Sequence, residues 1–330
     1  VQEDYELWEK IIRFINEHQM PRAEEPHPEF DEVVAVSAAI ERELSTFDCS
    51  AEKHPGRVTI RRLNKAEYNN TIRELTGLDL KLADDFPSDD VGYGFDNMAD
   101  VLTIPPLLLE KYLAAAETIA RRVFQDEDAK KRVVPEEAES PEEIVEVARA
   151  NVRYFAKRAF RRPITVAEED RLFELMRTAF VQGFPPEEIY EIVTVAILSN
   201  PNFIYRVEQD PGPDDEDGIA ELDGYELASR LSYFLWSSMP DDRLFELAES
   251  GELTKPEVLE SEAIRMLADP KSRALVDNFA GQWLQLRDVS SLTPDPELFP
   301  NFDGALRQAM RRETELFFEA VVREDRSVLE

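Results

Sequence analysis

The hydrophobic positions of the chain recur every three or four residues almost throughout, which is the spacing of one face of an α-helix. Alternation typical of β-strands is rare, and the 330 residues include only 11 glycines. Asn64 and Thr165 are each followed three residues later by glutamate, the pattern of a capping box at a helix start. The sequence therefore predicts an all-α fold of several packed helical units, with little or no sheet.

Prolines mark two further helix starts. Thr254 precedes Pro256 and Glu257, which predicts a cap at Thr254, and Asp269-Pro270 predicts a cap followed by proline at the first helical position. Apolar residues at helical spacing in the last third of the chain are predicted to form its core, namely Leu227, Leu231, Phe234, Leu235, Phe279, Trp283 and Leu286.

Two charged stretches interrupt the helical pattern and are predicted to be linkers. Residues 125–141 are bounded by proline, and residues 209–218 are acidic and contain proline and glycine, so neither stretch is expected to bury a core. Ahead of them, two predicted helices flank a proline-rich turn. We expect domains over residues 1–48, 57–125, 141–208 and 219–330, the first being the end of a larger domain and the last being incomplete.

The charge of the chain narrows the classes of partner. With 70 acidic and 38 basic residues the formal net charge is −32, so a DNA- or RNA-binding surface and a polybasic membrane anchor are excluded. Arginines (28) outnumber lysines (10), which fits either a hydrated surface suited to salt water or a bias in gene composition. No apolar stretch is long enough to span a bilayer.

The residue types of most active sites are scarce. Cys49 is the only cysteine, and the histidines are His18, His27 and His54. An internal disulfide and a cysteine-based zinc site are therefore excluded, and a catalytic triad or histidine-rich metal site cannot form in the later units.

An oxygen-rich segment over residues 84–97 is a candidate calcium site, because calcium prefers six to eight oxygen ligands. The alternative is a surface loop whose aspartates cap helices and turns. The candidate ligands are Asp84, Asp85, Asp89, Asp90, Asp96 and Asn97.

A basic cluster over residues 153–162 is a candidate anion site. Arg153, Lys157 and Arg161 follow i, i+4 spacing and are predicted to share one helix face, which suits a sulfated or carboxylated ligand. The alternative is pairing of these cations with the large surplus of acidic side chains within the protein.

Several longer strings resemble the planctomycete-type, cytochrome-c-linked proteins built from the PSD set of domains of unknown function. The strings, which occur along nearly the whole chain, are residues 57–75, 84–87, 92–97, 160–165, 199–206, 228–241 and 279–284. Residues 5–46 also resemble the end of a c-type cytochrome domain, in which a methionine after a helix binds haem iron. Met20-Pro21 stands at that position, although arginine follows where a second proline is typical.

The resemblance implies an exported protein, periplasmic or on the cell surface, with haem c attached upstream of this chain and Met20 as its axial ligand. It implies electron transfer or haem-dependent oxidation with an unidentified electron-transfer partner, and it transfers no catalytic residues. Two other functions stay open. One is a non-catalytic module that binds an anionic polysaccharide or calcium, and the other is a structural scaffold at the cell surface.

Overall fold

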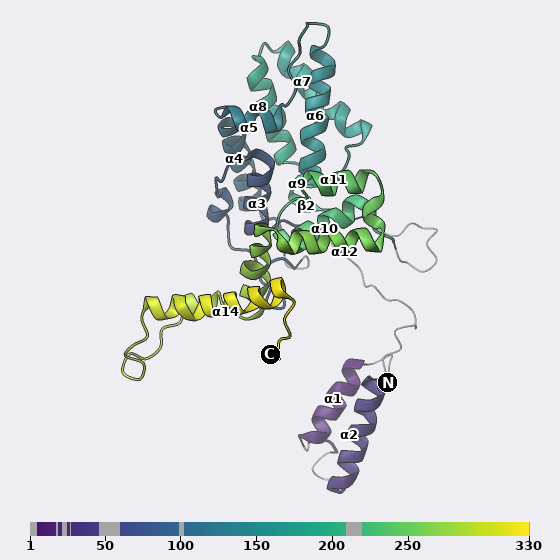
Figure 1. Cartoon of the computed structure of the whole chain (residues 1–330), viewed down its shortest axis with the longest axis vertical. Coiled ribbons are helices and arrows are strands. Elements are labelled where there is room, and N and C mark those ends of the chain that lie inside the picture. The colour runs from purple at the N-terminus through teal and green to yellow at the C-terminus, as the bar shows by residue number, and fades with distance from the viewer. Residues whose placement is uncertain are drawn as a thin grey trace. The chain divides into compact units, whose positions relative to one another are not determined.

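The computed structural model describes residues 5–17, 19–21, 25–26, 28–45, 60–98, 102–208 and 220–329. Within them lie fourteen α-helices and one two-stranded sheet, which confirms the all-α prediction (Figure 1). The chain forms two compact units, residues 1–57 and 58–330. None of the helices in the described ranges is both long and apolar enough to cross a bilayer.

The bounds of the elements are as follows. Unit 1 contains α1 (Tyr5–Asn16) and α2 (Phe30–Ser45). Unit 2 contains β1 (Arg61–Arg62), α3 (Lys65–Thr76), α4 (Pro106–Val123), α5 (Glu127–Val133), α6 (Ile144–Phe160), α7 (Val166–Val181), α8 (Pro186–Leu198), α9 (Pro201–Ile204), β2 (Tyr205–Arg206), α10 (Gly224–Trp236), α11 (Asp242–Glu249), α12 (Pro256–Ala268), α13 (Gly281–Trp283) and α14 (Gly304–Glu324).

Unit 1 is a pair of packed helices with almost no interior. Among its described residues only Ser37 is buried, and its hydroxyl donates to the Asn16 side chain at 3.1 Å. Large apolar side chains such as Leu7 and Phe30 stay exposed. Two helices alone therefore do not cover the apolar faces of α1 and α2.

The main core of unit 2 runs through the predicted domain boundaries. One cluster of buried side chains includes residues of every helix from α3 to α9, together with Tyr233, Met239 and Phe245. The short strands β1 and β2 pair antiparallel, with Arg61 opposite Arg206. The division of this region into separate domains stays a prediction, because these elements share one core.

A second apolar cluster holds α10, α11 and α12 together around the fully buried Trp236. Gly224 begins α10 where it meets α11, and a Cβ atom there would lie 2.8 Å from the Ala248 carbonyl oxygen. Only glycine allows this close approach of the two backbones.

The capping boxes form as predicted at α3 and α7. Asn64 and Thr165 accept from the amides of Glu67 and Glu168, and both glutamates reach back to the cap amide. The pKa of Glu168 is lowered to about 2, mainly because its carboxylate accepts hydrogen bonds from Arg162. Asp269 also caps as predicted, in front of a 3-10 turn.

Two other predictions need correction. Thr254 does not cap α12, because its hydroxyl donates to the Gly251 carbonyl and Lys255 takes the cap position without a side-chain bond. The stretch 125–141 is not a plain linker, since it contains α5, which buries Ala129 and Val133. The second predicted linker, residues 209–218, lies outside the described residues.

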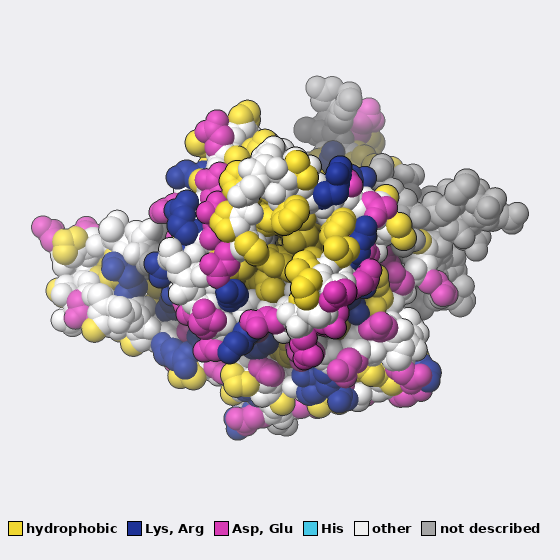
Figure 2. Space-filling model, turned by 90° about the horizontal axis from the view of Figure 1, so that it is seen from above, with side chains coloured by type: hydrophobic (Ala, Val, Ile, Leu, Met, Phe, Trp, Pro, Cys, Tyr) yellow, Lys and Arg dark blue, Asp and Glu magenta, His cyan; other side chains and the backbone are white. Residues whose placement is uncertain are grey.

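The predicted core of the last third is also only partly correct. Leu235 and Leu286 are buried, but Phe234 and Trp283 are 60% and 59% exposed and Phe279 is 37% exposed. Apolar side chains also gather on the face of unit 2 that looks upward in Figure 1, surrounded by acidic and basic ones (Figure 2). Helical spacing therefore overestimates the burial of apolar residues on a helix face that no other described element covers.

Candidate functional site

A π-helical segment, Leu275–Ala280, interrupts the helical geometry between α12 and α13. Such segments are rare and are frequently found at functional sites. Here Asp277 and Asn278 line two pockets, of about 350 and 850 Å³. The pockets also share Arg273, so they adjoin on either side of this segment. Together we call them the arginine cleft.

The arginine cleft concentrates basic side chains in a strongly acidic protein. Only two acidic residues line it, Asp277 and Glu315. Its basic lining residues are Arg73, Lys271, Arg273, Arg287, Arg311 and Arg312. They come from α3, from the 3-10 turn and loop before the π-helix, from the segment after α13, and from α14.

Glu315 lines the larger pocket and is the only buried residue of α14. Its carboxylate accepts from Arg311 Nε at 2.7 Å, from Arg312 Nη1 at 3.3 Å and from Arg273 Nη2. Burial by itself raises the pKa of Glu315, but these three hydrogen bonds outweigh it, and the pKa is lowered. Three guanidinium groups thus share one carboxylate, although Arg273 also contacts Asp277 and Glu319.

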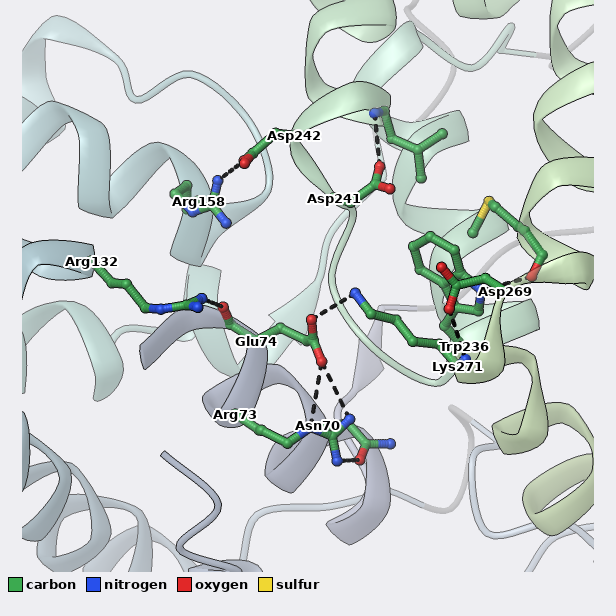
Figure 3. Close-up of polar contacts among 12 residues, drawn as sticks. Asn70, Arg73, Glu74, Arg132, Arg158, Trp236, Asp241, Asp242, Asp269 and Lys271 are labelled. Carbon is green, nitrogen blue, oxygen red and sulfur yellow. Dashed lines mark hydrogen bonds and ion pairs between the residues drawn. The ribbon is translucent and has the colours of Figure 1, made fainter. Parts of the chain in front are cut away.

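Two basic residues that line the smaller pocket, Arg73 and Lys271, both pair with Glu74 of α3. Lys271 Nζ lies 2.6 Å from one oxygen of its carboxylate, and Arg73 Nε lies 3.4 Å from the other (Figure 3). The same ammonium group lies 4.8 Å from the ring centroid of Trp236, whose indole donates to the Met266 carbonyl. The contact between Lys271 and Glu74 ties the segment before the π-helix to α3.

The loop over residues 92–97 closes against the π-helix. Asp96 accepts from Arg287 Nη1 at 2.5 Å and from Asn64 at 2.8 Å, and its amide donates to Gln282 at 2.8 Å. Arg287 also donates to Asn278 at 3.1 Å. Asp96 therefore orients a cleft arginine and connects the start of α3 to the last third of the chain.

The remaining candidate calcium ligands do not converge. Asp89 bonds Arg62 and the Lys65 amide, and Asp84 accepts from Asn69 at 2.8 Å. Asp85 and Asp90 are exposed, and Asn97 is half-buried. No three acidic, histidine or cysteine side chains of the described residues are arranged to hold a metal ion. Calcium binding stays a prediction that these contacts do not support.

The three residues of the predicted anion cluster at α6 have different surroundings in the structure. Arg153 and Lys157 are paired with Glu169 and Glu249, at 3.0 and 2.8 Å. Arg161 does not share their helix face, because it ends α6 in a left-handed conformation (φ 60°) and its side chain is buried. These contacts match the alternative of internal pairing for Arg153 and Lys157, whereas Arg161 pairs with backbone carbonyls.

Met20 lies in the turn between α1 and α2, and its residue is 45% exposed. Its role as a haem ligand stays a prediction. Cys49 and all three histidines lie outside the described residues.

The sequence alone did not reveal the arginine cleft, because its basic residues are spread from position 73 to position 312. The one local signal is the pair Arg311-Arg312 followed by Glu315, at i+4 and i+3. On a helix this spacing is more often a simple surface ion pair. Only packing of α14 against the π-helix makes the glutamate buried and shared.

Comparison with known proteins finds three family models. PSD3, a protein of unknown function (DUF1587), matches residues 61–125, PSD5 (DUF1595) matches 147–208, and PSD4 (DUF1592) matches 222–330. No curated protein and no solved structure matches. The arginine cleft combines Arg73 of the first matched region with residues of the third. The chain therefore carries three consecutive domains of the PSD set, in the order PSD3, PSD5 and PSD4.

Proposed function

We propose that the arginine cleft binds an anionic ligand that carries carboxylate or sulfate groups. The observation that carries this proposal is the sharing of Glu315 by three guanidinium groups at the wall of a pocket of about 850 Å³. One carboxylate does not occupy all the N–H donors of three guanidinium groups. The surplus of donors is what an incoming anion would use.

The two arginines of α14 are the best placed for this purpose. Their side chains are 43% and 51% exposed for Arg311 and Arg312. Their contacts within the described part of the chain use Nε of Arg311 and Nη1 of Arg312. A guanidinium group has five N–H donors in a planar fork, so donors of both residues remain for a ligand.

The negative net charge of the chain means that an anion is expected to bind at a local site and not by general attraction to the protein. A chain of net charge −32 repels anions over most of its surface, so an anion is expected to bind only where basic side chains outnumber acidic ones, as they do in the lining of the arginine cleft. A pocket of this volume suits a small molecule or a segment of a polymer.

Replacing both Arg311 and Arg312 with glutamine is expected to weaken binding of an anionic oligosaccharide about 100-fold or more, because each of the two arginines would lose a charge-assisted hydrogen bond of about 1.5–3 kcal/mol. Isothermal titration calorimetry with oligogalacturonate and with a sulfated oligosaccharide measures this. The matched control is Arg153→Gln with Arg177→Gln, which removes the same charge from exposed arginines paired elsewhere. Equal weakening by both double variants, or no binding by the parent, would overturn the proposal.

A second function is favoured by the lack of an interior in unit 1. The uncovered apolar faces of α1 and α2 fit a piece of a larger domain. Together with the resemblance to c-type cytochromes, this supports a haem c domain in an exported protein, with Met20 as axial ligand. Haem would supply one-electron transfer to a partner that is not identified, while Met20 would set its axial coordination.

Replacing Met20 with alanine is expected to remove the sixth ligand and to change the visible spectrum of the full-length protein, which includes the haem attachment site, produced with haem maturation. Met310→Ala is the matched control, because Met310 is equally exposed on α14. An unchanged spectrum in Met20→Ala would exclude Met20 as a ligand, and the absence of any c-type spectrum in the parent would exclude haem.

A further inference from the structure

A stack of three aromatic rings includes Phe279, the residue that directly follows the cleft residues Asp277 and Asn278. Phe95 stacks on Phe279 with ring centroids 5.8 Å apart and an angle of 18° between the rings. Phe279 in turn stacks on Trp283 at 5.7 Å and 28°. Trp283, the outer ring, is 59% exposed. An exposed tryptophan on a stacked base is unusual for a residue that serves only the core.

The stack is held in place by surrounding contacts. Phe95 lies in a tight turn in which it exchanges two backbone hydrogen bonds of 2.9 Å with Gly92. The amide of the next residue, Asp96, donates to Gln282, which lies one position before Trp283. Phe318 of α14 also packs on Phe279, with ring centroids 6.3 Å apart. The rings are therefore positioned before any ligand arrives.

The stack and the cleft belong to one segment. Asp277 and Asn278 line the cleft, and Phe279 follows them directly in the π-helix. Asp96, next to Phe95, pairs with the cleft residue Arg287. The stack therefore begins at the residue that follows the cleft lining, and a ligand that extends beyond the cleft along this segment would reach it. Amide side chains of Asn278 and Gln308 line the larger pocket.

We infer that the ligand of the cleft is an acidic oligosaccharide, with one sugar ring lying on Trp283; this rests on the proposed anion binding. The faces of aromatic rings are electron-rich and attract the weakly positive C–H face of a sugar ring. Arginines bind its carboxylate or sulfate groups, and amides suit its hydroxyl groups. A nucleotide also combines an anion with a ring that can stack, so it is tested below as the competing ligand.

Tetragalacturonate tests the inference by calorimetry and by tryptophan fluorescence. The fluorescence measurements use the Trp8→Phe variant as the parent. Of its two remaining tryptophans, Trp236 is buried and Trp283 is exposed. We expect tetragalacturonate to shift the emission. We expect Trp283→Ala to remove that shift and to weaken binding about two- to tenfold, in proportion to a typical aromatic contact. Trp283→Phe should restore most of the affinity, and the methyl ester of the tetramer should bind weakly.

The outcomes separate the two proposals. If sulfate and tetragalacturonate bind in a manner that depends on Arg311 and Arg312 but Trp283→Ala changes neither affinity, the sugar platform is wrong and anion binding stands. Tighter binding of adenosine monophosphate than of tetragalacturonate, with loss in Trp283→Ala, would overturn the saccharide in favour of a nucleotide. If no anion binds, both proposals fail.

Discussion

Replacing Arg161 with methionine is expected to lower the free energy of unfolding by about 3–5 kcal/mol. The guanidinium group donates to the carbonyls of Asn202, Phe203 and Tyr205 at 2.9, 2.9 and 2.7 Å. These carbonyls lie at the C-terminal end of the short helix α9, where helical partners are missing and a cation is favoured. Methionine matches much of the side-chain length but removes the donor from all three carbonyls, of which that of Phe203 is buried and the other two are partly buried.

Two effects reduce this cost without cancelling it. Burial lowers the pKa of Arg161, which shows that the charge is held there at some expense, and its removal relieves that expense. Each buried carbonyl left unpaired still costs about 1–3 kcal/mol. Denaturant unfolding of the parent and the variant, followed by circular dichroism, measures the difference.

Arg153→Gln is the matched control, because Arg153 belongs to the same sequence cluster but is 55% exposed. Its loss should change the free energy of unfolding by less than about 1 kcal/mol. If Arg161→Met unfolds at the same denaturant concentration as Arg153→Gln, the guanidinium group does not cap α9 in solution.

Replacing Asp89 with asparagine is expected to lower the free energy of unfolding by about 3 kcal/mol, with or without calcium. Its carboxylate lies 2.7 Å from Arg62 Nη2, and both side chains are nearly fully buried. The other oxygen accepts from the Lys65 amide at 3.0 Å, at the start of α3. Asparagine keeps the shape but leaves the Arg62 charge without its counter-charge.

The calcium hypothesis predicts a different result for the same variant. If Asp89 binds calcium, adding calcium should raise the unfolding midpoint of the parent and not that of Asp89→Asn. The structural role predicts equal midpoints for the parent in calcium and in a chelator. The neighbour Asp90 is exposed, so Asp90→Asn should leave stability unchanged if pairing with Arg62 is what matters.

The three matched regions pack together through a shared core. The hydroxyl of Tyr233, in the PSD4 region, lies 2.9 Å from Thr71 Oγ1 of the PSD3 region. The same hydroxyl accepts from Arg161 of the PSD5 region at 3.4 Å. Arg206 also lies over the Tyr233 ring, 4.7 Å from its centroid. A cleft built from the first and third regions therefore depends on contacts with the second.

Local signals predicted helices well and side-chain surroundings poorly. The capping boxes at Asn64 and Thr165 were correct because the cap and the glutamate three residues later interact within one turn. The i, i+4 spacing of Arg153, Lys157 and Arg161 suggested a common face, yet α6 ends at Phe160 and turns Arg161 inward. Periodicity also placed Trp283 in the core, because spacing does not reveal whether another element covers a face.

The sequence by itself determined the helical architecture of this protein, the starts of several helices and the kinship to the PSD set, because these depend on short-range spacing and on continuous strings of residues. The tertiary structure alone decided that Arg161 caps α9, that Asp96 orients Arg287, and that α3, the π-helix and α14 form one basic cleft. These contacts join residues up to about two hundred positions apart. Such juxtapositions arise from packing of a shared core, which no local pattern encodes.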